Sequence, residues 1–166
     1  MLKGFITNLG KYNEGELVGE WIDFPIDEEK LEKVFERIGI SDEPDENGIY
    51  YEEYFFTDWE CDIATGLGEY VNIEEVNDLA ERLAECDEDI IGALGEYGYE
   101  LEKALNKHDD VVFYHNMTLL DVAYQIVEEC YNLPEIAERY FDYEAFARDL
   151  GFDGYYEARN GVILID

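Results

Sequence analysis

Residues 2–25 read LKGFITNLGKYNEGELVGEWIDFP and contain two apolar segments on either side of a Gly/Asn-rich connection. Apolar segments of this length that flank turn-forming residues are typical of paired β-strands. The first strand is predicted over residues 2–9 and the second over residues 17–24, joined by residues 10–15. Pro25 ends the second strand, because proline has no backbone N–H to donate to a sheet. The chain therefore begins with a small sheet.

A helix and a third strand are predicted directly after this pair. Asp27 supplies an N-cap side chain and Gly39 stands where a C-cap glycine belongs, which places a helix between them. The apolar face of this helix consists of Leu31, Val34, Phe35 and Ile38. After a polar loop over residues 41–48, the aromatic-rich residues 49–59 predict the third strand of the same sheet.

The sequence becomes helical from about residue 61. Apolar side chains recur every three to four residues and predict helices over residues 73–83, 90–97 and 101–105. A short apolar strand follows over residues 110–114.

The C-terminal part of the chain predicts two further helices and a hairpin. Thr118, with Asp121 three residues later, forms a capping pattern that opens a helix through Cys130, which Leu133–Pro134 terminates. Asp142 caps the next helix and Gly151 closes it. A terminal hairpin is predicted from residues 155–158 and 162–165 around Arg159-Asn160-Gly161. The predicted fold class is α+β, with small α/β units at both ends and a helical middle, divided into domains 1–60, 61–107 and 108–166.

The charge balance is the most informative feature of the composition. The chain holds 43 Asp and Glu against 11 Lys and Arg, a net charge of −32, and yet 47% of its residues are hydrophobic. Residues 1–60 carry 17 acidic and 5 basic side chains, and residues 61–107 and 108–166 each carry 13 and 3. A chain this apolar can fold, so we interpret the charge as an extremely anionic surface and not as a disordered tail. Its natural partner is a basic surface.

Composition also disfavours several functions. Eleven scattered cations offer no basic patch for nucleic acid or anionic lipid, and no apolar run approaches the roughly 18 residues needed to span a membrane. The chain opens with no signal-peptide pattern. We therefore expect no direct nucleic acid binding, no membrane contact and a cytoplasmic location. The widely spaced Cys61, Cys86 and Cys130 predict three buried, reduced thiols.

Acidic side chains form columns on predicted helix faces. In the helix from Ile73 the acids follow at spacings of four and three residues, and a similar pattern appears after Asp27. Like charges at these spacings destabilise a helix by about 0.2–0.5 kcal/mol per pair. A solvated helix face explains any one column, whereas the repetition favours a surface selected for negative charge. The predicted charge-bearing positions are Asp27, Glu28, Glu32, Glu36, Glu74, Asp78, Glu81, Glu85 and Glu88.

Duplex DNA is the commonest biological object with a comparable surface. DNA carries one charge per roughly 1.7 Å of axis, so 32 charges correspond to about 54 Å, or about 16 base pairs. This comparison is an upper bound because it counts every charge. It indicates a protein that presents a phosphate-like array to a DNA-binding groove.

Catalytic patterns are weak by contrast. Ser41 is the only serine and lies in no Gly-x-Ser-x-Gly motif. The two histidines, His108 and His115, have no Cys or His at metal-ligand spacing. Carboxylates beside aromatic residues are expected by chance in this composition. We therefore expect no enzyme activity, no metal and no cofactor.

Two other functions stay open at this stage. A calcium-binding acidic protein is one, because Glu43, Asp45, Asn47 and Gly48 occupy positions 1, 3, 5 and 6 of an EF-hand-like loop. Position 12 is Tyr54 where a bidentate Glu is required, which favours an ordinary acidic turn. The other is an immunity or chaperone protein for a single basic partner.

Two segments resemble the ArdA family of antirestriction proteins. The N-terminal one is ITNLGKYNEGELVGEW at residues 6–21, followed by Phe24-Pro25, and its Asn-Leu-Gly-Lys-Tyr run is distinctive. The C-terminal one is DYEAFARDL at residues 142–150, with Gly154 following. Between them the likeness rests mainly on charge and helical character.

The resemblance implies a specific function. ArdA proteins are DNA mimics from mobile genetic elements that occupy the DNA-binding groove of type I restriction–modification enzymes inside the bacterial cell. Proteins of this family are elongated, have three domains and form homodimers through the C-terminal domain. We therefore expect a DNA-mimicking inhibitor of the methyltransferase core. Two such acidic chains repel each other, so their contact needs an uncharged surface. The predicted dimer interface is the most apolar short strand in the chain, which consists of Val111, Val112, Phe113 and Tyr114. The alternative is that this strand belongs to the core of its own domain, because alternate residues of a strand face inward.

Overall fold

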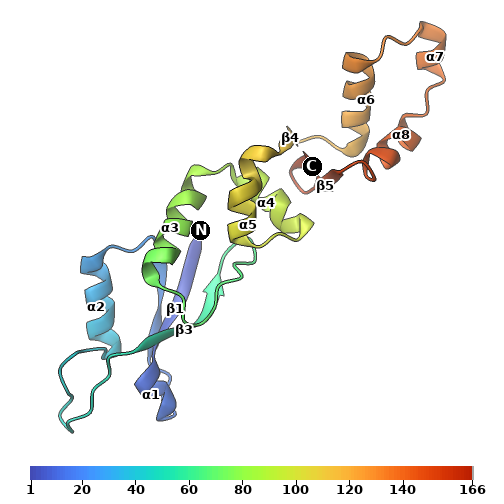
Figure 1. Cartoon of the computed structure of the whole chain (residues 1–166). Helices are drawn as coiled ribbons and strands as arrows, with labels where there is room; N and C mark the ends of the chain where they lie inside the picture. Colours follow the sequence, from blue (N-terminus) through green and yellow to red (C-terminus); the bar gives the residue numbers. More distant parts are fainter. Residues whose placement is uncertain (166) are drawn as a thin grey trace. The chain divides into compact units, whose positions relative to one another are not determined.

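Two three-stranded antiparallel sheets, each with its own helices, make up the described part of the chain. The structure is a computed structural model that describes residues 1–165, so that Asp166, the last residue of the predicted C-terminal domain, lies outside it. The two sheets belong to separate units: Met1–Glu85 forms the first, and the second begins at Cys86. Figure 1 shows the elements of both units. The fold is α+β, as the sequence predicts.

The sheet of the first unit has the strand order β2-β1-β3. Its strands are β1 (Leu2–Asn8), β2 (Gly19–Phe24) and β3 (Tyr54–Glu60). Both neighbours pair with β1 in antiparallel register, and the register with β3 shifts between Phe5 and Ile6. Since alternate residues of a strand face opposite sides, Leu2 and Ile6 are buried whereas Lys3 and Phe5 are half-buried on the other face.

The buried face of this sheet packs against amphipathic helices. Helix α2 (Glu28–Ile38) buries Val34 and Ile38, and α3 (Ile73–Glu85) buries the apolar side that the periodicity predicts. The Asn77 side chain attaches α3 to the end of β2: Oδ1 accepts from Ile26 N at 2.7 Å and Nδ2 donates to Ile26 O at 2.9 Å. The opposite sides of α2 and α3 are therefore open to solvent.

In the second unit the central strand is covered on both faces. Strands β4 (Val112–His115), β5 (Tyr155–Ala158) and β6 (Gly161–Leu164) lie in the order β4-β6-β5. Val162 joins a core with α6 (Leu119–Cys130) and α8 (Tyr143–Leu150). Ile163, its fully buried neighbour, faces the other side, where α4 (Glu88–Tyr97) contacts β5 and β6 and packs with α5 (Leu101–Lys107). Short elements complete the unit: a 3₁₀ turn at His108–Asp110 and α7 (Glu135–Arg139).

The capping predictions are confirmed. Asp27 accepts from Lys30 N at 2.8 Å, and Gly39 ends α2 with a φ of 72°, a left-handed conformation that favours glycine. Thr118 and Asp121 form a complete capping box, and Asp142 caps α8 by accepting from Ala145 N.

Several predicted boundaries are wrong. The third strand begins at Tyr54 and not at residue 49, because Tyr51 makes only an isolated bridge to Ser41. The connection over residues 10–15 contains most of a short helix, α1 (Leu9–Asn13), which Asn8 caps. The strand predicted over residues 110–114 begins at Val112, because the chain before it continues as a 3₁₀ turn.

Helix α7 has no counterpart among the predicted elements. It spans a single turn and buries none of its residues, so it leaves no apolar periodicity for the sequence to reveal. The predicted division into domains 1–60, 61–107 and 108–166 stays a prediction. Within the two units, α3 packs with the first sheet, and α4 and α5 pack with the second.

Candidate functional site

The nine predicted charge-bearing residues are all exposed. Four lie at the start of or along α2, four along α3 and one on α4. The prediction of one continuous acidic column from Ile73 to Glu88 is wrong. Helix α3 ends at Glu85, and Glu88 is the first residue of α4 in the second unit. Asp87 separates the two helices because its carboxylate caps α4 by accepting from Asp89 N and Ile90 N.

Helix α2 carries the cleanest acidic column. Glu28, Glu32 and Glu36 are spaced four residues apart, so they lie on one face, one turn above another. Among residues 1–165, none of the three forms an ion pair within 4.0 Å. The column therefore keeps its charge uncompensated.

The cations of α2 pair with other carboxylates. Lys30 Nζ lies 2.8 Å from Asp27, Lys33 Nζ lies 2.6 Å from Glu29, and Arg37 binds Glu20 on β2. The hydrogen bond from Lys30 also holds the pKa of Asp27 below its ordinary value. Asp27 thus acts first as a helix cap, and the three glutamates remain available to a partner.

Helix α3 presents a second column. Glu74, Asp78, Glu81 and Glu85 are exposed on the side opposite the buried Val76 and its apolar neighbours. Asp78 is partly neutralised by Arg82, whose Nη1 lies 3.9 Å from its carboxylate. Three carboxylates of this column form no ion pair within 4.0 Å among the residues the structure describes.

A third acidic surface was not predicted, because it lies on strands and the predicted columns were found from helical spacing. Cross-strand pairing puts Asp23, Asp58 and Glu60 on the half-exposed face of the first sheet, on the same side as Lys3. Lys3 Nζ lies 3.9 Å from Asp23 and 3.8 Å from Glu60. The signal that indicates this face is alternation: Asp23 lies between the buried Ile22 and Phe24 in β2, and Asp58 and Glu60 are two residues apart in β3.

The predicted dimer segment forms an edge of the second sheet. Within the described chain β4 pairs with β6 alone, so its outer edge has no partner strand. Val112 is 51% exposed, whereas Tyr114 packs on the core around Val162 and Phe113 stacks edge-on against His115 at 4.6 Å. Val111 lies outside the strand. The dimer interface stays a prediction, with Val112 as its most accessible side chain.

The EF-hand-like loop already uses its central carboxylate. Asp45 Oδ1 accepts from Asn47 N at 2.8 Å and from Ile49 N at 2.9 Å, and the bond from Ile49 is the main cause of the lowered pKa of Asp45. This is an Asx turn. Glu43 and Gly48 belong to the same exposed loop. Over residues 1–165, no three His, Cys, Asp or Glu side chains are grouped closely enough to hold a metal ion.

The histidines and cysteines occupy unrelated positions. His108 Nδ1 lies 3.0 Å from Leu105 O, and His115 lies between the carboxylates of Asp87 and Asp89. The cysteines form no disulfide, but the prediction that all three are buried is wrong. Cys130 is exposed and the other two are half-buried, because each follows or ends an element at the surface of its unit. No helix in the described part is long and apolar enough to cross a membrane.

The comparison with known proteins identifies a family. No curated protein sequence matches the chain significantly. A family model described as "Antirestriction protein (ArdA)" matches residues 5–163, which is nearly the whole chain of 166 residues. Both segments that carry the resemblance lie within this match. The chain therefore belongs to the ArdA family of antirestriction proteins.

Proposed function

We propose that this protein inhibits type I restriction–modification enzymes by occupying their DNA-binding groove as a mimic of DNA. Membership of the ArdA family implies antirestriction activity, and hence a restriction–modification enzyme as the partner in general. The family is one of inhibitors. The DNA-mimic mechanism and the type I target are our proposal, and the uncompensated acidic columns are the observation that supports them.

The spacing of the columns shows what the mimicry requires. Four residues of α-helix rise about 6 Å, so one column offers one charge per about 6 Å of helix axis. One DNA strand offers a charge per about 3.4 Å. A single column therefore carries fewer charges per unit length than one strand of DNA. Several acidic surfaces, such as the α2 column, the α3 column and the open face of the first sheet, must act together to reach the charge density of DNA.

The same argument favours a homodimer. Two copies would double the anionic surface to a charge of −64, which matches about 32 base pairs at the DNA charge spacing. Because two such chains repel, their contact needs a locally uncharged surface. The open edge of β4 with the exposed Val112 offers one. Replacing Val112 by Asp should convert dimers to monomers in analytical ultracentrifugation, with circular dichroism as the check on folding.

A competition assay tests the proposed function. Labelled duplex DNA is bound to a purified type I methyltransferase, and the protein is titrated in. We expect the DNA to be displaced, and the displacement to require less protein at low ionic strength because the contacts are between opposite charges. Failure to displace DNA at any salt concentration would refute the proposal.

The alternatives predict different results. A calcium-binding protein should bind calcium stoichiometrically and melt at a higher temperature in its presence. The Asx turn of Asp45 does not support calcium binding, because two backbone N–H groups already donate to one oxygen of that carboxylate. An immunity or chaperone protein should bind one basic partner without competing broadly with DNA.

A further inference from the structure

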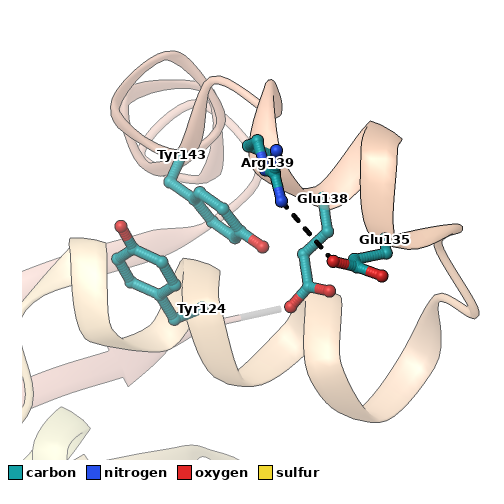
Figure 2. A pocket seen from close by; sticks show the side chains of 5 residues that line it. All are labelled: Tyr124, Glu135, Glu138, Arg139 and Tyr143. Carbon is teal, nitrogen blue, oxygen red and sulfur yellow. Dashed lines mark hydrogen bonds and ion pairs between the residues drawn. The ribbon is translucent and has the colours of Figure 1, made fainter.

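Helices α6, α7 and α8 of the second unit border an open pocket of about 360 Å³ (Figure 2). Its lining combines two kinds of side chain, aromatic and charged: Tyr124, Tyr143, Glu135, Glu138 and Arg139. This pocket lies outside the acidic columns on α2 and α3. It is also chemically different from them, because a DNA mimic requires carboxylates but no aromatic wall.

The aromatic wall is formed by two stacked tyrosines. The rings of Tyr124 and Tyr143 lie 4.0 Å apart at 20°, and Phe141 supports Tyr143 edge-on at 4.8 Å. Partial burial raises the pKa of Tyr143, and the nearby carboxylate of Glu138 raises it further. Figure 2 shows the Tyr143 hydroxyl directed toward Glu138 and Arg139. Aromatic faces beside carboxylates attract a cationic group.

The pocket already holds one guanidinium group, which comes from the chain itself. Arg139 Nη2 lies 3.5 Å from Glu135 Oε1, with 69% and 90% of these side chains exposed. An ion pair so exposed contributes little free energy. A cation from a partner could therefore take its place at small cost.

Two strongly exposed apolar side chains belong to the same short segment of the chain as the charged residues of the pocket. Ile136 on α7 is 72% exposed, and Tyr140, which directly follows the last residue of this helix, is 79% exposed. Exposed apolar groups that lie close together in the chain and are surrounded by polar residues are typical of protein-binding surfaces. This pair of residues, called the apolar strip below, carries no charge and therefore differs from the carboxylate columns.

Charge decides what kind of partner fits. Residues 119–142 contain six acidic side chains and the single cation Arg139. A second copy of the chain would bring the same excess of negative charge to the contact, and a DNA duplex would bring phosphates. The occupant that complements this region is a basic protein surface with an apolar centre.

We propose that the pocket and the apolar strip of Ile136 and Tyr140, together the α7 surface, dock a basic protein partner by an Arg or Lys side chain that enters the pocket. This inference rests on the proposed function, in which the partner is the restriction–modification enzyme. The contact is one that DNA itself cannot make. It adds an apolar component to binding that salt does not screen, so the inhibitor keeps an advantage over DNA where salt weakens both sets of ionic contacts.

The test measures the dissociation constant for a purified type I methyltransferase from low to high salt. The variant I136S/Y140S removes the strip without changing charge, and I49S/Y50S is the matched control on an exposed loop of the first unit. We expect I136S/Y140S to weaken binding about tenfold at every salt concentration, as for loss of an interface hot spot. The slope of log Kd against log salt should not change, because no ionic contact is lost. The control should bind like the unaltered protein.

A second pair of variants tests the pocket. Tyr143→Leu removes the aromatic face and should weaken binding several-fold, whereas Tyr143→Phe keeps the face and should bind normally. Thermal unfolding of each variant shows whether it is folded. Equal losses for Phe and Leu would overturn the cation-binding role of the pocket.

The outcomes separate the two proposals. If the unaltered protein does not bind the enzyme, the proposed function fails. If it binds and I136S/Y140S binds equally well at all salt concentrations, the docking surface alone is refuted. If I136S/Y140S instead turns a dimer into a monomer in sedimentation, the surface is occupied by a second copy and the inference is wrong.

Discussion

Asn8 shows how one side chain connects three elements of the first unit. It is fully buried at the end of β1, and its Nδ2 donates to Ile38 O at 3.0 Å and to Gly39 O at 3.1 Å. Its Oδ1 accepts from Lys11 N at 3.0 Å and so caps α1. Every polar atom of the amide is satisfied. The Asn-Leu-Gly run that resembles the ArdA family thus has a structural role at its first residue.

Replacing Asn8 by Asp should destabilise the protein by about 2–3 kcal/mol near neutral pH. A carboxylate would face two carbonyl oxygens in a buried site, which raises its pKa in the folded state above the ordinary value. The loss in free energy of unfolding should therefore be largest above that raised pKa and should become smaller as the pH falls through it. Urea unfolding at several pH values, with the unaltered protein at each pH as reference, measures this. A loss that does not depend on pH would contradict the expected ionisation.

The capping box of α6 makes a second prediction at this scale. Thr118 Oγ1 donates to Asp121 Oδ2 at 2.7 Å, and this bond is the main cause of the lowered pKa of Asp121. A lowered pKa means that the stabilisation is present above the ordinary carboxyl pKa and is lost as the pH falls through the lowered one. Thr118→Ala should cost about 1 kcal/mol at pH 7. The difference between T118A and the unaltered protein should shrink in acid, which thermal unfolding at pH 7 and pH 3 can check.

At the scale of the element, α2 separates two uses of acidic residues. The three cations of α2 form ion pairs with Asp27, Glu29 and Glu20. The column on one face of the helix remains uncompensated, and it consists of Glu28, Glu32 and Glu36. Two neighbouring pairs of like charge in this column cost about 0.2–0.5 kcal/mol each. The column is therefore better suited to a partner than to the stability of its own helix.

The triple variant E28Q/E32Q/E36Q should melt at a slightly higher temperature and inhibit less strongly. Both effects follow from removing three repelling charges from the same face. The control E43Q/E46Q/E52Q changes the net charge equally but on the exposed segment before β3. Equal loss of inhibition in both variants would show that total charge matters and position does not. Glu32→Gln alone should leave inhibition nearly intact, since one charge among many is lost.

At the scale of the whole molecule, the net charge of −32 opposes folding and drives association. Salt screens both interactions over a Debye length of about 10 Å at 0.1 M. The melting temperature should therefore rise between about 0.02 M and 0.2 M NaCl, while affinity for the enzyme falls. Calorimetry and binding titrations in the same buffers measure the two trends. A melting temperature that falls over this range would contradict a fold strained by its own charge.

Local interactions explain which features the sequence reveals. The caps at Asp27, Thr118 and Asp142 were predictable because each side chain bonds a backbone group only three residues away. The faces of α2 and α3 were predictable because helical periodicity separates their buried residues from their acids. The α+β class and the extreme charge follow from such patterns and from composition.

Contacts between distant residues explain what the sequence does not reveal. Arg37 neutralises Glu20 from 17 residues away, and Asn8 reaches Ile38 across 30. The break between Glu85 and Glu88 depends on Asp87 capping a new helix, and the pocket beside Tyr143 depends on α6, α7 and α8 meeting. The amino-acid sequence thus determines how much negative charge the surface carries and on which helix faces, because these depend on composition and local period. Only the tertiary structure decides which carboxylates stay unpaired and where aromatic rings meet them, because these depend on side chains that folding brings together from separate parts of the chain.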